Sequence, residues 1–114
     1  MEDCIFCQIA ARKIPSKAVY EDDALFAFED INPKAPVHIL LIPKAHHASL
    51  NEVPDSESGL LGRLLMAARK IARDKGIAAQ GYRIVLNTAR DSGQDVFHIH
   101  FHLLGGRRMT WPPG

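Results

Sequence analysis

Residues 98–104, "HIHFHLL", carry three of the six histidines of the chain on alternate positions. Successive side chains of a β-strand point to opposite faces, so a strand here turns all three imidazoles to one side. The apolar residues Phe97, Ile99, Phe101 and Leu103 then lie on the other side. We expect the apolar face to pack in the core and the opposite face to display the imidazoles.

Three interpretations of these histidines compete. The first is a polar solvent face, although Thr, Lys or Glu would be more usual there than three histidines. The second is a metal site, because His-x-His places two imidazoles on one face of a strand, as catalytic zinc sites require. The third is nucleophilic or acid–base catalysis, because an imidazole with a pKa of about 6.5 keeps one ring nitrogen free near pH 7. The spacing along the strand favours separate roles for the three.

The rest of the chain predicts the elements around this strand. Hydrophobic periodicity and turn residues predict a short helix in residues 4–13 capped by Asp3, strands at 17–22, 24–30 and 37–43, an amphipathic helix at 56–75, and strands at 82–88 and 96–106. A turn at Asp22 and Asp23 joins the first two strands, and Gly76 ends the long helix. Leu60, Leu61, Leu64, Leu65, Ala68, Ile71 and Ala72 form the apolar stripe of that helix. This order predicts an α+β fold, an antiparallel sheet of about five strands with both helices against one side.

Length and composition set limits on the class of protein. The 114 residues, 46% of them hydrophobic, fit a single domain spanning 1–114. The formal net charge is +1, so no overall field favours nucleic acid or an anionic membrane. No apolar run is long enough to span a membrane, and the N-terminal residues do not resemble a signal peptide. We therefore expect a cytoplasmic protein without a membrane or nucleic-acid partner.

The loop before the histidine strand, "NTARDSGQD" at residues 87–95, contains Asn87, Gly93 and Gln94. Glycine lets backbone N–H groups approach an anion closely, and amide side chains add further donors. Such a loop is usually an ordinary connector. Beside three histidines it is also a candidate phosphate or oxyanion cradle.

The motif and its surroundings resemble the histidine triad (HIT) family, in particular its Hint branch. The similarity covers "CIFCQIAARKIPSKAVYEDDALFAFEDINPKAPVHILLIPKAH" at 4–46, "GYRIVLNTARDSGQDVFHIHFHLLGGR" at 81–107 and the terminal "WPPG", whereas the long helix matches in pattern only. The resemblance implies a hydrolase that binds a purine nucleoside monophosphate unit, AMP or GMP, and cleaves the bond from its phosphorus to an amine. It also implies a homodimer with contacts through the long helix and the 82–88 strand.

The same resemblance implies roles for individual residues. His100 corresponds to the nucleophile that forms a nucleotidyl-histidine intermediate, His102 contacts the phosphate, and His38 supports the triad that begins at His98. The matching substrate positions are Asn87, Gly93, Gln94 and Val96 on the phosphate side, Ile5, Phe6, Ile9, Phe28 and Ile31 around the base, and Asp30 at the ribose hydroxyls. Without the family, the apolar residues of this set are core positions and Asp30 caps a turn.

Two further positions bear on leaving-group choice. Asp95 replaces the small hydroxyl residue of animal members of the family, and some bacterial relatives carry an acid here, so the chain resembles a bacterial-type enzyme. We hypothesise that Asp95 favours cationic amines as leaving groups. Trp111 is an exposed tail residue by its sequence alone, but the resemblance places this tail near the active site of the neighbouring subunit.

The two cysteines, Cys4 and Cys7, have the spacing Cys-x-x-Cys. A redox motif normally follows a strand, and only three residues precede this pair; two inert thiols are a second possibility. The third is structural zinc bound by two thiolates and two imidazoles. Many triad proteins with this pair complete the site with the histidine of "PKxH" and the first triad histidine, which here are His46 and His98, with His47 a possible substitute for His46. Such zinc would take no part in catalysis.

Two other functions remain compatible with the sequence. A diadenosine polyphosphate hydrolase shares the same chemistry, but the C-terminal "GGRRMTWPPG" is more similar to the Hint branch. A binding or scaffold protein would hold a purine nucleotide without turnover, and the presence of all three triad histidines argues against it.

Overall fold

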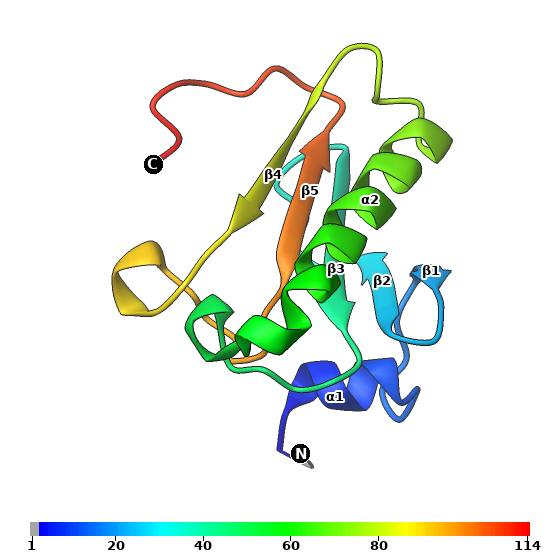
Figure 1. The fold of residues 1–114 in the computed structure, drawn as a ribbon. Helices are drawn as coiled ribbons and strands as arrows, with labels where there is room; N and C mark the ends of the chain where they lie inside the picture. Colours follow the sequence, from blue (N-terminus) through cyan, green and yellow to red (C-terminus); the bar gives the residue numbers. More distant parts are fainter. Residues whose placement is uncertain (1–2) are drawn as a thin grey trace.

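A computed structural model describes residues 3–114 of the chain (Figure 1). The elements are α1 (Ile5–Ala10), β1 (Ala18–Glu21), β2 (Leu25–Glu29), β3 (Val37–Pro43), α2 (Ser58–Asp74), β4 (Tyr82–Leu86) and β5 (Phe101–Gly105), with short 3-10 helices at Leu50–Glu52, Asp55–Glu57 and Arg90–Ser92. The strands form one antiparallel sheet in the order β1-β2-β3-β5-β4. The predicted fold class is confirmed.

The hairpin of β1 and β2 turns at Asp22, as the sequence predicts. The Asp22 carboxylate accepts hydrogen bonds of 2.9 and 2.8 Å from the backbone N–H groups of Ala24 and Leu25. These bonds satisfy donors that the tight turn would otherwise leave unpaired.

One face of the sheet packs against α2, which crosses it diagonally in Figure 1. The core on this side consists mainly of inward-facing strand residues and the stripe of α2: Leu25, Ala27, Ile39, Leu41, Leu64, Ala67, Ala68, Ile71, Ala72, Phe101 and Leu103. Gly76 has a φ of +74°, a conformation that glycine adopts without strain, and it ends the helix as predicted. Leu65 departs from the predicted stripe, because its side chain is 40% exposed.

The other face of the sheet packs against α1, so the prediction that both helices cover one side is wrong. Phe6 and Ile9 of α1 are buried against Phe26, Phe28, Leu40 and Ile42 of the sheet. The cap of α1 also differs from the prediction. Cys4, and not Asp3, is the N-cap residue, and its Sγ accepts a hydrogen bond of 3.3 Å from the Cys7 backbone N–H.

The histidine strand begins later than the alternating pattern predicts, at Phe101 and not at Val96. In the segment before it, the Ile99 N–H donates a 2.7 Å hydrogen bond to the His47 carbonyl, which is not part of a strand. Phe97, predicted to be in the core, is 60% exposed. His98 and His100 are buried, because their side of the sheet lies under α1 and not in solvent.

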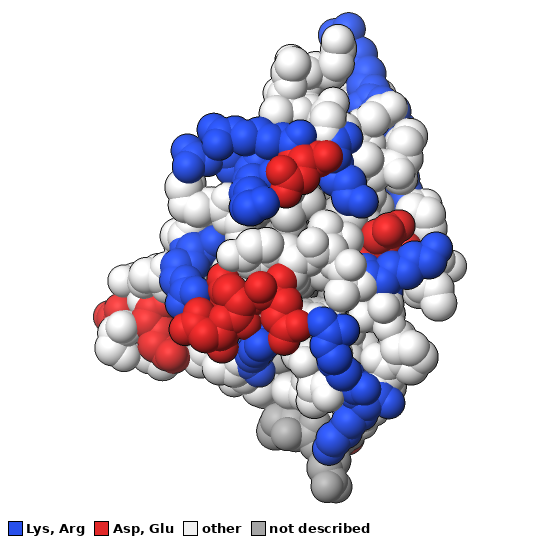
Figure 2. Space-filling view, turned by 90° about the vertical axis from the view of Figure 1, so that its right-hand side faces the viewer, with Lys and Arg blue, Asp and Glu red and all other residues white. Residues whose placement is uncertain are grey.

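The face formed by the β1–β2 hairpin and α2 carries acidic and basic side chains close together (Figure 2). Arg63 of α2 lies 3.3 Å from an oxygen of Asp22 and 2.9 Å from one of Asp23, and Lys70 lies 2.7 Å from Asp74. Acidic side chains gather near the middle of this face in Figure 2, with basic side chains around them. Within residues 3–114, none of the helices has both the length and the apolar character that crossing a membrane requires.

Candidate active site

One ring nitrogen of His100 makes a hydrogen bond to the backbone, and the other does not. Its Nδ1 lies 2.9 Å from the carbonyl oxygen of His98. A carbonyl only accepts, so Nδ1 carries the proton and donates it. The lone pair of the neutral ring is then on Nε2, 3.9 Å from a carboxylate oxygen of Asp95. This is the arrangement that a nucleophilic imidazole requires.

A chain of hydrogen bonds sets the tautomers of His38 and His102 in the same way. The Lys34 backbone N–H donates to Nδ1 of His38 at 3.0 Å, so the proton of a neutral His38 lies on Nε2. That Nε2–H points to Nδ1 of His102, 2.9 Å away. His102 therefore carries its own proton on Nε2, as a hydrogen-bond donor.

Burial keeps these imidazoles neutral. It lowers the pKa of His102 to about 4, and the neighbouring His100 and His38 rings act in the same direction. Burial also lowers the pKa of His38, although the negative charge of Asp30 opposes the shift. At neutral pH both rings are uncharged, as the assigned hydrogen bonds require.

A cavity of about 370 Å³ opens beside these rings. It brings together five residues that the sequence predicts for the site and four that it does not: Asp30, His38, Asn87, Asp95 and His102, with Asn32, Lys34, Val85 and Leu104. Lys34 and Asn32 lie in the turn after Asp30, and Val85 and Leu104 flank the histidines on β4 and β5. Proximity to a predicted site residue is the only signal for them in the sequence.

Asp30 caps a turn, as its sequence context predicts, and it also lines the cavity. Its Oδ1 accepts a 2.7 Å hydrogen bond from the Asn32 backbone N–H, which caps the turn. Its Oδ2 lies 3.4 Å from Nε2 of His38. Both residues line the cavity. The turn therefore fixes a carboxylate beside the histidines.

The five apolar residues predicted around the base divide into two groups. Phe6, Ile9 and Phe28 are buried in the core between α1 and the sheet, with the Phe6 and Phe28 rings in edge contact at 5.6 Å. Ile5 and Ile31 are exposed, at 47% and 91%. Of the buried three, Phe6 meets the His100 ring edge-on at 5.0 Å, and neither of the exposed two is in the cavity lining.

The loop before the histidines uses Gln94 as an internal brace. Its side-chain oxygen accepts from the Ala89 N–H at 2.8 Å, and its NH₂ donates to the carbonyls of Ala48 and Val96 at 2.8 and 3.1 Å. The predicted phosphate role would have to come from other groups of this loop, because these bonds already occupy the Gln94 amide. Gly93 has a φ of +84° and ends the 3-10 helix.

The neighbours of Gln94 lie on different sides of the loop. Asn87 lines the cavity, whereas Val96 packs against the core between α1 and the sheet. Of the residues predicted on the phosphate side, Asn87 is therefore the one whose side chain borders the cavity.

A second cluster lies behind the triad. The donor atoms of Cys4, Cys7, His46 and His98 all lie within 4.8 Å of one another. The Nδ1 of His98 is 3.3 Å from Sγ of Cys4 and 3.5 Å from Sγ of Cys7, and the Nδ1 of His46 is 3.4 Å from Sγ of Cys7. These are the four residues predicted as zinc ligands. His47, the predicted substitute for His46, instead points its Nε2 to Glu57 at 3.2 Å.

The chemistry of this cluster fits a tetrahedral zinc ion. Zn–S bonds of about 2.3 Å and Zn–N bonds of about 2.0–2.1 Å place sulfur and nitrogen ligands about 3.5 Å apart. The Nε2–H of His98 donates to the Pro43 carbonyl at 2.8 Å, which leaves the Nδ1 lone pair directed to the sulfurs. Burial raises the pKa of the Cys7 thiol, and a metal ion bound to its sulfur would displace the thiol proton.

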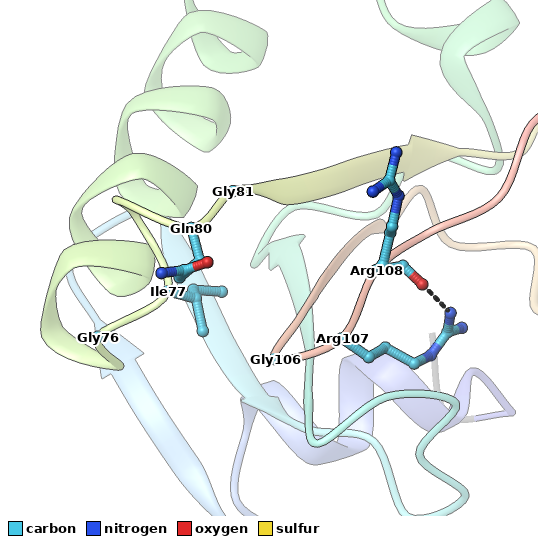
Figure 3. Close-up of a pocket in the computed structure, with 7 residues that line it drawn as sticks. All are labelled: Gly76, Ile77, Gln80, Gly81, Gly106, Arg107 and Arg108. Atoms are coloured by element: carbon cyan, nitrogen blue, oxygen red, sulfur yellow. Dashed lines mark hydrogen bonds between the residues drawn. The ribbon is translucent and has the colours of Figure 1, made fainter.

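A larger hollow, of about 440 Å³, lies elsewhere, beyond the end of β5 (Figure 3). Its lining is Gly76, Ile77, Gln80, Gly81, Gly106, Arg107 and Arg108. Arg107 is already engaged, donating to the carbonyls of Lys34 and Arg108 at 3.0 and 3.2 Å. This lining contains no nucleophile or proton-transfer group, so the smaller cavity beside the histidines is the candidate active site.

The C-terminal tail runs past β4 (Figure 1), where Arg83 donates a 3.0 Å hydrogen bond to the Thr110 carbonyl. Trp111 is 81% exposed. Within the described chain it is not part of the cavity lining, so any role at a site depends on a second subunit.

Comparison with known proteins agrees with this geometry. The model of the HIT domain family matches residues 11–109. The purine nucleoside phosphoramidase of Escherichia coli K12 is 51% identical over 108 residues, which cover 95% of this chain and 91% of the relative.

Solved structures show the same relationship. A HIT family hydrolase from Legionella pneumophila has a TM-score of 0.96 and 52% identity, covering 98% of this chain and all of that one. A histidine triad nucleotide-binding protein from Candida albicans has a TM-score of 0.82 and 33% identity, covering 96% of this chain and 83% of that one. The resemblance inferred from the motif is thus confirmed, and the chain belongs to the HIT family.

Proposed function

We propose that the protein is a hydrolase that cleaves the phosphorus–nitrogen bond of purine nucleoside monophosphate amides. The observation that carries this proposal is the hydrogen bond from Nδ1–H of His100 to the His98 carbonyl, which leaves the lone pair on Nε2, 3.9 Å from the carboxylate of Asp95, a residue that lines the cavity. The identity to a relative named purine nucleoside phosphoramidase supports the choice of substrate class.

The reaction would proceed in two displacements. Nε2 of His100 forms a bond to the α-phosphorus as the phosphorus–nitrogen bond breaks, and the departing amine nitrogen takes a proton from water. Water then attacks the phosphorus of the nucleotidyl-histidine, releasing the nucleoside monophosphate and the neutral imidazole. Splitting one displacement into two lets a neutral imidazole act as the nucleophile near pH 7.

His102 supplies a hydrogen-bond donor next to His100. Its Nε2–H is fixed by the bond that its Nδ1 accepts from His38, and its ring lies 5.0 Å from that of His100, centre to centre. This donor suits a phosphoryl oxygen that gains charge during the attack, or the departing amine. Asp30 would bind the ribose hydroxyls from the same cavity.

The experiment is hydrolysis of adenosine 5′-phosphoramidate by the wild type and by His100→Ala, with diadenosine polyphosphates assayed in parallel. We expect cleavage of the amide by the wild type and its loss in the variant. Preferred cleavage of diadenosine polyphosphate would contradict the substrate class. Binding of AMP without turnover of any substrate would contradict the enzyme proposal.

We also propose that the Cys4, Cys7, His46 and His98 cluster binds a structural zinc ion. The short sulfur–nitrogen distances and the free Nδ1 of His98 support this. Four protein ligands leave no open position, so the zinc would stabilise the fold and not activate water. Metal analysis of protein purified without a polyhistidine tag should give about one zinc per chain. A value near zero that refolding with zinc does not change would contradict the site.

A homodimer is the assembly we propose. β4 is an edge strand of the sheet with half-buried side chains, and Leu65 and Met66 of α2 are 40% and 51% exposed. An open strand edge and exposed apolar residues favour association. Light scattering should give twice the monomer mass. Removal of residues 110–114 should alter substrate preference if the tail of one subunit reaches the site of the other, whereas unchanged kinetics would indicate a passive tail.

A further inference from the structure

His98 takes part in both functional clusters. Its ring nitrogen Nδ1 lies 3.3 Å from Sγ of Cys4, in the cysteine–histidine cluster. Its carbonyl oxygen, on the same residue, accepts the 2.9 Å hydrogen bond from Nδ1 of His100. A shift of His98 therefore moves the carbonyl oxygen that holds the proton of His100 on Nδ1.

The segment that carries His98 and His100 lies outside the hydrogen-bonded ladder of the sheet, because β5 begins at Phe101. The His98 ring donates to the Pro43 carbonyl, and the Ile99 N–H donates to the His47 carbonyl at 2.7 Å. Both acceptors lie close in sequence to His46, another member of the cluster. The segment at His98 and the residues around His46 are thus joined by these hydrogen bonds and by the cluster.

α1 links the same cluster to His100 from the other side. Cys4 caps this helix and Cys7 lies within it, and between them the Phe6 ring meets the His100 ring edge-on at 5.0 Å. An isolated helix of six residues is not stable in water, so tertiary contacts must hold α1 in place. The bonds of Cys4 and Cys7 to the cluster are the polar part of those contacts.

We propose that Cys4, Cys7, His46 and His98 act as a positioning site for His100. Zinc bound there fixes α1 and His98, and thereby keeps His100 with Nδ1 protonated and Nε2 free. This inference rests on the proposed function, in which His100 is the nucleophile. Without the metal, His100 exchanges between tautomers and turnover falls about 10- to 100-fold, as when the partners that orient a functional imidazole are removed.

The test uses two variants of His46, which does not line the cavity, and one of its neighbour. His46→Ala removes a ligand, whereas His46→Cys replaces it with another zinc ligand. His47→Ala is the matched control, because the His47 side chain points to Glu57 and lies outside the cluster. For each protein, one measures metal content, kcat on adenosine 5′-phosphoramidate, the Kd of AMP and the ring tautomer of His100 by nitrogen-15 NMR.

We expect His46→Ala to lose the metal, to show a mixture of His100 tautomers and to lose kcat about 10- to 100-fold with a smaller change in the Kd of AMP. His46→Cys and His47→Ala should keep the metal, the Nδ1–H tautomer and kcat. Loss of the metal with an unchanged tautomer and kcat within twofold of the wild type would overturn the inference, and so would a wild type that binds no zinc.

Two further outcomes are separable. If His46→Ala does not fold, the wild type stripped by a chelator and then reloaded replaces it, and the same NMR signals decide while circular dichroism confirms folding. If the wild type hydrolyses no nucleotide amide, the proposed function fails. In that case the positioning role is still supported if removal of the metal changes the His100 tautomer. It is contradicted if removal of the metal leaves the tautomer unchanged.

Discussion

His38 and His102 lie diagonally across neighbouring strands, with Nε2 of one 2.9 Å from Nδ1 of the other. In the register of β3 and β5, His38 is opposite Leu104 and His102 is opposite Leu40, so both imidazoles leave the same face of the sheet. The sheet itself therefore positions the His102 imidazole beside the cavity.

Removing this contact should slow the reaction without abolishing it. In His38→Leu, Nδ1 of His102 loses its donor and the ring is free to take the other tautomer. We expect kcat to fall about tenfold, since a net hydrogen bond contributes about 1 kcal/mol. His38→Gln keeps an N–H donor and should recover part of the loss. Steady-state kinetics on adenosine 5′-phosphoramidate checks this, and equal activity of His38→Leu and the wild type would contradict it.

The protein should lose stability as the pH falls from about 6.5 towards 4. The pKa of His102 is about 4 in the folded protein and returns to its ordinary, higher value on unfolding. Between these values the unfolded chain binds more protons than the folded protein, so the free energy of unfolding decreases as the pH falls. The groups that face His102 are His38, His100, Asp30 and Asp95.

Urea unfolding of the wild type and of His102→Gln at pH 7, 6 and 5 isolates the contribution of His102. The variant should lose less stability over this range than the wild type, because it lacks one of the groups that must be protonated. Parallel losses in the two proteins would show that other groups cause the pH dependence.

Ala89 stores backbone strain in the loop before the histidines. Its φ of 67° and ψ of −173° belong to a region occupied almost only by glycine. Gln94 holds this conformation by accepting the Ala89 N–H. Ala89→Gly should therefore raise the free energy of unfolding by about 1 kcal/mol, after the greater entropy of glycine in the unfolded chain is subtracted. Denaturant unfolding measures this, and a loss of stability would show that the conformation is unstrained.

Asp95 should favour cationic leaving groups. Its carboxylate lies 3.9 Å from Nε2 of His100, and its side chain is 84% exposed, so it is near the bond that breaks and open to an incoming amine. Asp95→Ser should reduce kcat/KM about fivefold for a lysine-like leaving group and little for a neutral one, since one charge pair in water contributes about 1 kcal/mol at 4 Å. Equal losses on both substrates would exclude this role.

The sequence by itself determined the order of elements and the five-stranded sheet, because periodicity and turn chemistry are local properties, whereas the resemblance to the family supplied the residues expected in the two clusters. It also indicated the family through the motif and the stretches around it. Its errors follow from the same locality. Alternation alone predicted that the last strand begins at Val96, that Phe97 is in the core and that His98 and His100 face solvent. In the structure the strand begins at Phe101, Phe97 is exposed and both histidines are buried.

Only the tertiary structure decided what covers the histidines and which ring nitrogen carries each proton. α1 covers the face that alternation left open, and the bond of His38 to His102 joins residues 64 positions apart. The contact of Cys4 with His98 spans 94 positions. A tautomer depends on which donor or acceptor lies opposite each ring nitrogen. Here the fold places those groups, from β3, from the loop before it and from the segment before β5.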